Sequence, residues 1–255
     1  MSSSGAAFFD LDNTLIRGSS LYFLGRGMYH RGYFTKADIS KFVVANVRFR
    51  LTGTEKPEVI DRFKKAAQDF IGGHKVSDIH QLGSEIYDEY ISPALVQKTI
   101  DIAKSHLATG REVWLVSAAP EDLAKIIASK LGFTGAIGSK AEIKNEIYTG
   151  NLDGPVLHGA AKAAAVCDLA KNRNLNIKEC YAYSDSANDL PLLESVGYPN
   201  AINPDAKLRI RALVEEWPIH DFRKFRFINR LLGPTVSRIV ALAAYLAPRG
   251  GRKPE

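Results

Sequence analysis

Two carboxylates, Asp10 and Asp12, come directly after the apolar stretch Ala6–Phe9. If this stretch is a strand, the i, i+2 spacing points both side chains the same way at its carboxyl end. Two carboxylates held this close repel each other unless a cation neutralises them or one keeps a proton. The pair is therefore a candidate for metal binding or acid–base catalysis, although the same spacing also occurs in solvated turns and helix caps.

A second acidic pair, Asp185 and Asp189, follows the apolar stretch 180–183 within the sequence Ser-Asp-Ser-Ala-Asn-Asp, which also contains Asn188. Carboxylates in loops at strand ends suit Mg²⁺, because this ion keeps several waters and accepts a few carboxylates together with a substrate phosphate. An ordinary turn and helix cap is the alternative. The two acidic pairs together predict a magnesium site.

Ser117 and Lys162 are candidates to bind phosphate. Ser117 ends the apolar stretch 112–116 and precedes Ala118 and Pro120 at the start of a predicted helix. A hydroxyl beside free helix amides suits a phosphate oxygen, although Ser117 could equally be a simple N-cap. Lys162 begins an Ala-rich helix whose small side chains would let the ammonium reach inward to a carboxylate and a phosphate. A solvent-exposed lysine is the alternative.

Short apolar stretches rich in β-branched and aromatic residues alternate with amphipathic stretches long enough for helices. The predicted strands are Ala6–Phe9, 112–116, 136–137 with its neighbours, 180–183 and Tyr198–Ile202, and the predicted helices are 93–108, Glu121–Leu131 and 159–172. This alternation is typical of the α/β class, with a doubly wound parallel sheet. Ligands bind at the carboxyl ends of such strands, where the candidate residues lie.

The segment from about Gly18 to Ile91 interrupts this alternation. It contains helical patterns and no convincing strand, at residues 19–30, 35–51, 56–71 and 76–90. We therefore predict a helical cap inserted after the first strand, with residues 18–91 as the cap and residues 1–17 and 92–215 as the α/β core. Residues 140–150 alternate around Asn145 and Glu146, which predicts a small β-hairpin.

The combination of these groups resembles the haloacid dehalogenase (HAD) superfamily of phosphohydrolases, in particular the phosphoserine phosphatase-like branch, which has a helical cap after its first motif. The resemblance covers about residues 5–210. The four motifs are Asp10-Leu-Asp12-Asn-Thr14, Ser117, Lys162 and Ser184-Asp185-Ser-Ala-Asn188-Asp189-Leu-Pro-Leu. The first and last of these, at this separation, form a highly specific combination.

The resemblance implies a Mg²⁺-dependent phosphatase with Asp10 as the nucleophile that forms an aspartyl-phosphate. Asp12 would protonate the leaving alcohol and then deprotonate the attacking water. The metal ligands would be Asp10, the main-chain carbonyl of Asp12, and Asp185, with Asp189 as a direct or outer ligand.

The resemblance also implies the phosphate contacts. Ser117, with the adjacent Ala118, and Lys162 would hold the phosphoryl oxygens, and Lys162 would also pair with Asp10. Asn188 would contact the phosphate or order its loop. Positioning and charge stabilisation supply most of the catalysis in phosphoryl transfer.

The substrate is expected to be a small metabolite phosphate, but two features depart from the phosphoserine-specific pattern. Phosphoserine phosphatases place a glutamate in the loop after the first motif, whereas here no acid occurs between Asp12 and Asp38, and Ser117-Ala-Ala-Pro120 replaces Ser-Gly-Gly. Arginines and aromatic residues of the cap could bind an anionic or larger apolar ester, or could only cover its outer face: Arg26, Tyr29, Arg31, Tyr33, Phe34, Arg48 and Arg50.

Composition places the chain among globular proteins, with 45% hydrophobic and 24% charged residues. The formal charge of +6 comes from the C-terminal end, because residues 222–255 contain eight Lys or Arg and one acid. We predict a basic amphipathic extension over residues 216–255. It could lie on an anionic membrane surface, or dock on the body or on a second subunit. Nucleic acid is not an expected partner, because the sequence contains no recognisable nucleic-acid-binding module.

The sequence shows no signal peptide and no apolar run of the length that spans a bilayer. We therefore expect a cytoplasmic protein, with peripheral attachment to the inner face of the membrane as an alternative. In that alternative the substrate would be a lipid-derived phosphate, such as phosphatidylglycerophosphate or a lysolipid phosphate. A catalytically idle HAD scaffold that acts as an interaction protein is the remaining alternative.

Overall fold

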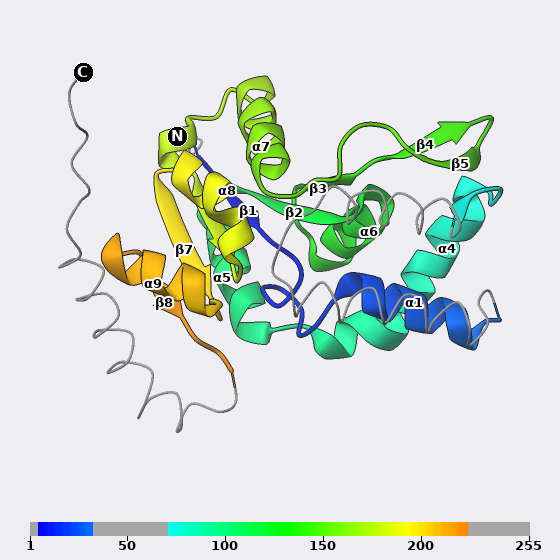
Figure 1. Cartoon of the computed structure of the whole chain (residues 1–255), viewed down its shortest axis with the longest axis horizontal. Helices are drawn as coiled ribbons and strands as arrows, with labels where there is room; N and C mark the ends of the chain where they lie inside the picture. Colours follow the sequence, from blue (N-terminus) through cyan, green and yellow to red (C-terminus); the bar gives the residue numbers. More distant parts are fainter. Residues whose placement is uncertain (1–4, 33–70, 224–255) are drawn as a thin grey trace, which may run out of the picture.

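The computed structural model describes residues 5–32 and 71–223 of the chain. Within them, six strands form a fully parallel sheet in the order β3-β2-β1-β6-β7-β8 (Figure 1). These strands are β1 (Ala6–Phe9), β2 (Glu112–Pro120), β3 (Gly135–Ser139), β6 (Tyr181–Ser184), β7 (Tyr198–Ile202) and β8 (Ile219–His220). The predicted doubly wound α/β fold is confirmed.

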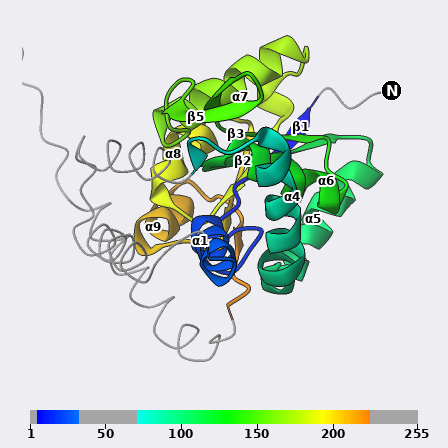
Figure 2. The same ribbon diagram turned by 90° about the vertical axis from the view of Figure 1, so that its right-hand side faces the viewer.

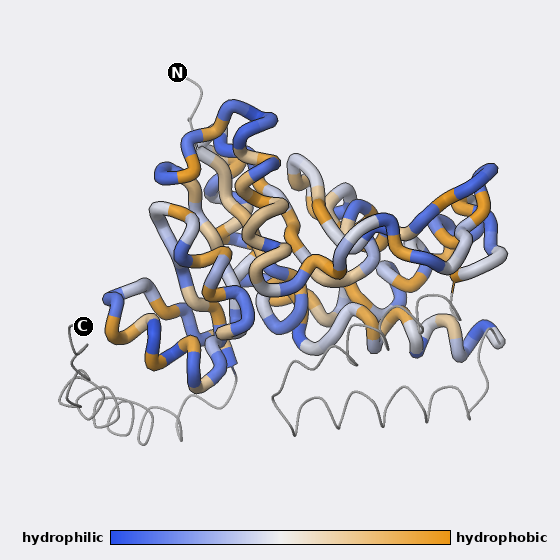
Figure 3. The backbone as a smooth tube through the Cα atoms, turned by 45° about the horizontal axis from the view of Figure 1, so that its top comes forward, coloured by the Kyte–Doolittle hydropathy of each residue, from blue (hydrophilic) through white to orange (hydrophobic). Residues whose placement is uncertain are grey.

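Helices cover both faces of this sheet. Figure 2 shows α5 and α6 on one side and α8 and α9 on the other. The helices outside the insertion are α5 (Gln97–Ala108), α6 (Glu121–Leu131), α7 (Ala160–Asn172), α8 (Leu190–Ser195) and α9 (Ala206–Val214). Along these helices apolar and polar residues alternate (Figure 3), as expected for elements with one buried face.

The central strand β1 is buried on both faces, which explains its uninterrupted apolar sequence. Ala7 and Phe9 belong to one hydrophobic cluster, which includes residues of α5 and α6. Ala6 and Phe8 belong to a second cluster, on the side of α7, α8 and α9. The strand thus separates two cores and holds its carboxyl end in a fixed place.

One predicted helix begins later than expected. Residues 93–108 were predicted as one helix, but Ser92–Ala94 forms a 3₁₀ turn and α5 starts at Gln97. The main chain is extended at Leu95 because this segment pairs with the loop after β1. The Val96 amide donates to the Leu15 carbonyl at 2.8 Å, and Leu95 bridges Ile16.

The described part of the helical insertion consists of α1 (Ser20–His30), α4 (Val76–Ile86) and the π-helical turn Tyr87–Ile91. The two helices meet at Gly27, where an added Cβ would lie 2.5 Å from Cγ1 of Ile86. Arg31 joins them further with ion pairs to Glu85 and Glu89. The predicted cap helices at 35–51 and 56–71 fall on residues 33–70, which lie outside the described residues apart from Ile71.

The predicted hairpin is confirmed as β4 (Ala141–Lys144) and β5 (Ile147–Leu152). Its turn residues, Asn145 and Glu146, have φ angles of 50° and 61°, as a two-residue primed turn requires. On its other side β5 binds the end of the insertion, because the Gly73 amide donates to the Tyr148 carbonyl and the Tyr148 amide donates to the His74 carbonyl. The hairpin therefore connects the insertion to the core.

The sheet continues past position 216, where we expected the extension to begin. Ile219 and His220 pair with Ala201 and Ile202 of β7, and Trp217 packs against the second cluster. The rest of the predicted basic tail, residues 224–255, lies outside the described residues. Among the helices that the structure describes, none has the length and apolar character needed to cross a membrane.

His106 of α5 makes the stability of the fold depend on pH. It is buried, and its Nε2 lies 2.8 Å from the hydroxyl of Tyr183. Burial lowers the pKa of His106 from 6.5 to about 4, and the charge of Arg111 adds to the shift. As the pH falls from about 7 to about 5, the unfolded chain binds a proton at this position and the folded protein does not. We therefore expect His106 to cost the folded protein about 2 kcal/mol of unfolding free energy over this range.

Urea unfolding of the wild type and of His106→Gln across that pH range measures this contribution. The wild type should lose more unfolding free energy than the variant as the pH falls. A difference between the two proteins that stays constant with pH would contradict a neutral buried His106.

Candidate active site

Strand register brings the predicted site residues to one edge of the sheet. Phe9, the last residue of β1, pairs with Leu115 of β2 and with Tyr183 of β6. The residues that follow on each strand, including Asp10, Ser117 and Asp185, therefore lie at the same carboxyl edge. The Asp10 amide donates to the Tyr183 carbonyl at 2.9 Å, which extends the pairing into the site.

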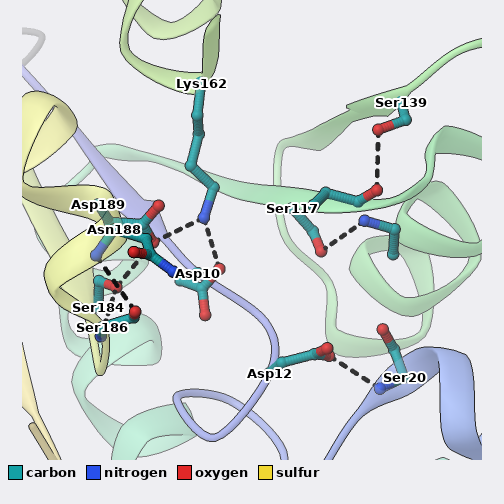
Figure 4. Close-up of polar contacts among 12 residues, drawn as sticks. Asp10, Asp12, Ser20, Ser117, Ser139, Lys162, Ser184, Ser186, Asn188 and Asp189 are labelled. Atoms are coloured by element: carbon teal, nitrogen blue, oxygen red, sulfur yellow. Dashed lines mark hydrogen bonds and ion pairs between the residues drawn. The ribbon is translucent and has the colours of Figure 1, made fainter. Parts of the chain in front are cut away.

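Lys162 joins two of the acidic residues at this edge. Its Nζ lies 2.6 Å from Oδ1 of Asp10 and 2.7 Å from Oδ2 of Asp189 (Figure 4). All three side chains are buried. Burial alone would lower the pKa of Lys162, but the two carboxylates outweigh this effect and raise it. Lys162 is therefore held as a cation beside Asp10, and it does not face solvent.

The sequence of α7 explains why this lysine points inward. Lys162, Val166 and Ala170 are the buried residues of the helix and follow each other at intervals of four, so they share one face. Asp189 has a second donor, because the Ser184 hydroxyl donates to the same Oδ2 atom that Lys162 binds, at 2.7 Å. The Ser184 oxygen in turn accepts from the Ser186 amide. Hydrogen bonds of Ser184 thus order the segment after β6 that contains Asp189.

Asp12 lies at the amino end of α1. Its Oδ1 accepts a hydrogen bond from the Ser20 amide at 2.8 Å, where the helix presents free N–H groups and a partial positive charge. Burial raises the pKa of Asp12, while hydrogen bonds from Ser20 and Ser19 oppose this effect. Asp12 is therefore oriented by the first helix of the insertion and does not share the lysine that binds Asp10.

Ser117 and Ala118 lie near the end of β2, where its pairing with β3 becomes irregular before α6 begins. The Ser117 side chain is buried, and its Oγ accepts from the Ala119 amide at 3.1 Å. Such a local hydrogen bond is typical of a serine at a turn or at the start of a helix. The Ser117 oxygen lies at the same carboxyl edge of the sheet as Asp10 (Figure 4). The loop therefore offers a hydroxyl next to the carboxylates.

Four carboxylates and one ammonium meet at this edge, so the site has an excess of negative charge. Burial raises the pKa of Asp185, and the neighbouring carboxylates, Asp10 before Asp189, raise it further. Burial also raises the pKa of Asp10, against the opposing effect of Lys162. Uncompensated carboxylates with hard oxygen donors are what a divalent cation such as Mg²⁺ needs. The residues present therefore fit the predicted metal.

Among residues 5–32 and 71–223, no three Asp, Glu, His or Cys side chains converge on a single point at metal-ligand spacing. The predicted ligand set needs fewer side chains, because it combines Asp10 and Asp185 with the main-chain carbonyl of Asp12. Water would complete the coordination of Mg²⁺. The side chain of Asp12 binds the Ser20 amide, and the side chain of Asp189 binds Lys162. We therefore do not assign these two side chains as direct metal ligands.

The predicted site residues lie at the same edge of the sheet, but one of them, Asn188, is exposed to solvent. Asn188 lies in the 3₁₀ turn after β6 and is exposed, so its contact with phosphate stays a prediction. Sequence reasoning missed Ser20 as a partner of Asp12, although the start of a helix at Ser20 is a signal for free amides at that position. It also missed Ser139, which nothing in the sequence near β3 marks.

Comparisons with known proteins agree with this geometry. A family model described as haloacid dehalogenase-like hydrolase matches residues 7–194. The chain is 44% identical over 250 residues to a Mycobacterium tuberculosis (strain ATCC 25618 / H37Rv) protein named phosphoserine phosphatase SerB1, covering 98% of this chain and 81% of that protein. It is 29% identical over 221 residues to a histidinol-phosphatase of Neisseria meningitidis serogroup C (strain 8013), covering 85% of this chain and 98% of that protein.

A solved structure also shares the fold. It is a protein of unknown function from Bordetella pertussis Tohama I, with a TM-score of 0.74 and 26% identity. The match covers 85% of this chain and 97% of that one.

Proposed function

The chain belongs to the haloacid dehalogenase-like hydrolase family, and from this premise we propose that it hydrolyses phosphate monoesters with Mg²⁺ through an aspartyl-phosphate on Asp10. It is a phosphoric monoester hydrolase of the phosphoserine phosphatase-like kind. The observation that carries the proposal is the buried Asp10–Lys162–Asp189 group at the carboxyl edge of the sheet. Such a group fixes a carboxylate nucleophile where an anionic ester can be neutralised.

In the first half of the reaction an oxygen of Asp10 attacks the phosphorus. Lys162 binds Oδ1 of Asp10, which leaves Oδ2 as the attacking atom. The bond between phosphorus and the alcohol oxygen breaks, and that oxygen keeps the electron pair and takes a proton from Asp12. Lys162 and Ser117 would bind the phosphoryl oxygens, because the ammonium contacts Asp10 and the hydroxyl lies at the same carboxyl edge of the sheet.

In the second half a water molecule attacks the phosphorus of the aspartyl-phosphate. Asp12, now a carboxylate, accepts the proton of this water, and the bond to Asp10 breaks, so that phosphate and free Asp10 result. The Ser20 amide keeps Asp12 in place in both halves. Mg²⁺ bound by Asp10, Asp185 and the carbonyl of Asp12 would supply the positive charge that lets an anionic nucleophile approach an anionic ester.

We propose a small metabolite phosphate as the substrate and residues 18–91 as the cap that selects it. In the described part of the cap, α1 contains no acidic residue, and Glu85 and Glu89 are paired with Arg31. Glu85 and Glu89 therefore offer no free carboxylate to an ammonium group and do not favour an amino acid ester such as phosphoserine. Of the other acids in the described part of the cap, Asp88 pairs with Lys130 and Asp78 is exposed. A lipid-derived phosphate remains the alternative, and the same experiment distinguishes the two.

The test is a hydrolysis assay of the purified chain with Mg²⁺. We expect release of phosphate from a generic aryl phosphate, and higher kcat/KM on one of the soluble esters than on a lipid ester. The soluble panel contains phosphoserine, histidinol phosphate, glycerol phosphates and phosphocholine, and phosphatidylglycerophosphate in vesicles represents the lipid class. Hydrolysis of the lipid ester alone would establish the alternative substrate, and hydrolysis of no ester would overturn the enzymatic proposal.

A further inference from the structure

Residues 117–119 of β2, which we call the Ser117 loop, leave the regular ladder with β3. Val116 of β2 pairs with Ile137 of β3, but the next pair joins Pro120 to Ser139, so the register shifts between them. Two extra residues of β2 therefore bulge away from β3, and their peptide groups need partners outside the ladder.

Ser139, the last residue of β3, supplies one of these partners. Its hydroxyl donates to the Ala118 carbonyl at 2.8 Å and accepts from the Leu157 amide at 3.0 Å. Ser139 is buried, at 6% exposure. Leu157 lies just before α7, the helix that contains Lys162. The Ser139 hydroxyl therefore connects the Ser117 loop with the segment that leads into α7.

The Ala118–Ala119 peptide is fixed at both of its polar ends. Its carbonyl accepts from Ser139, and its N–H donates to Oγ of Ser117 at 3.1 Å (Figure 4). A serine hydroxyl has two lone pairs and one proton. Because the Ala119 N–H occupies one lone pair of Ser117, the hydroxyl proton stays available to donate to a phosphoryl oxygen.

The packing of β3 leaves this loop little freedom. A Cβ added at Gly138 would lie 2.8 Å from the Ala119 carbonyl oxygen and 2.6 Å from Cα of Glu121. The end of β3 is therefore in direct contact with the main chain of the loop. This close approach, together with the register shift, places the Ser139 hydroxyl between the loop peptide and the Leu157 amide.

We propose that Ser139 is a positioning residue for phosphate binding, which acts by orienting the Ser117 hydroxyl through the Ala118–Ala119 peptide. The inference rests on the proposed phosphatase function. Ser139 lies outside all four motifs. Without its hydroxyl the peptide can rotate, the Ser117 oxygen loses its fixed donor, and the Ser117 proton is no longer directed at the phosphate.

Inorganic phosphate, the reaction product, is the probe for this role. For Ser139→Ala we expect the inhibition constant of phosphate and the KM of an aryl phosphate to rise about tenfold, which corresponds to about 1.4 kcal/mol. The kcat should fall less than the KM rises. A merely structural role would lower the folded fraction, which reduces the apparent kcat and leaves both binding constants unchanged.

Thr134→Ala is the matched control. The Thr134 hydroxyl accepts from the Val113 amide at 2.9 Å, so it is also a hydroxyl bound to the main chain of β2, but it lies just before β3, at the end away from the site. We expect the binding constants of this variant to equal those of the wild type. Ser139→Cys keeps the size of the side chain and weakens its hydrogen bonds, so its phosphate inhibition constant should lie between those of Ser139→Ala and the wild type. This variant replaces Ser139→Ala in the test if the alanine variant does not fold.

A double-mutant cycle with Ser117→Ala tests the route of the effect. If Ser139 acts through Ser117, its replacement should change phosphate affinity by less than about twofold in the Ser117→Ala background. Additive effects in the double variant, an unchanged phosphate inhibition constant in Ser139→Ala, or an equal rise in the Thr134 control would each overturn the proposal.

Calorimetric titration of phosphate with Mg²⁺ separates this proposal from the proposed function, because it needs no turnover. A wild type that neither hydrolyses esters nor binds phosphate contradicts the proposed function. If the wild type and Ser139→Ala bind phosphate equally well, the result contradicts only the role of Ser139 and leaves the proposed function standing.

Discussion

Asp10→Asn is expected to reduce kcat/KM on every phosphate ester by at least about 10³-fold, or more than about 4 kcal/mol of transition-state stabilisation. The amide has the shape of the carboxylate but is not a nucleophile towards phosphorus, so the aspartyl-phosphate cannot form. Steady-state hydrolysis measures the loss. Mass spectrometry of acid-quenched protein should show phosphate on residue 10 of the wild type and none on the variant.

The fold should survive this substitution, because Lys162 keeps its contact with Asp189 and one buried negative charge is removed. Asp168→Asn is the matched control. Asp168 lies on α7 with a side chain that is 71% exposed, and its replacement should leave activity unchanged. Equal activity of Asp10→Asn and the wild type would rule out Asp10 as the nucleophile.

Lys162→Met is expected to abolish detectable turnover and also to destabilise the fold. The substitution leaves Asp10 and Asp189 buried without their shared cation, and removing one partner of a buried ion pair typically costs about 3 kcal/mol. Burial raises the pKa of Asp10, so its carboxylate takes up a proton as the pH falls. The destabilisation should therefore be largest above pH 7 and become smaller as the pH falls towards about 5.

Urea unfolding at several pH values measures this effect. Lys171→Met, on the same helix, is the control, because the Lys171 side chain is 79% exposed and its ion pair with Asp168 is long, at 3.8 Å. Such surface pairs contribute little. If Lys162→Met and Lys171→Met unfold at the same urea concentration, the buried charge group does not stabilise the protein.

The sequence predicted much of the fold because local patterns were consistent with the final packing. The stretch Ala6–Phe9 is apolar because both of its faces are buried. The Asn145-Glu146 pair predicted the turn of the hairpin, and the structure gives these residues the positive φ angles that such a turn needs. The inward direction of Lys162 follows from its position on the face of Val166 and Ala170.

Other features depend on contacts that no local pattern shows. The two residues of β8 become a strand only because β7 offers them a free edge. The start of α5 is delayed because Val96 binds the Leu15 carbonyl, far away in the sequence. The role of Ser139 depends on the register shift of β2, and a serine at the end of an ordinary strand gives no sign of it.

The position of β1 in the sheet has a consequence for synthesis on the ribosome. This strand is made first, but its neighbours in the finished sheet, β2 and β6, come from residues 112–120 and 181–184. The nascent chain therefore carries β1 without either neighbour until residues 112–120 have been made, and without its second neighbour until residues 181–184 have been made. Unpaired apolar strands associate readily. Newly made chains should thus depend on chaperones that bind the exposed β1 segment, and the catalytic edge can form only after β6 and the acidic residues that follow it have been made.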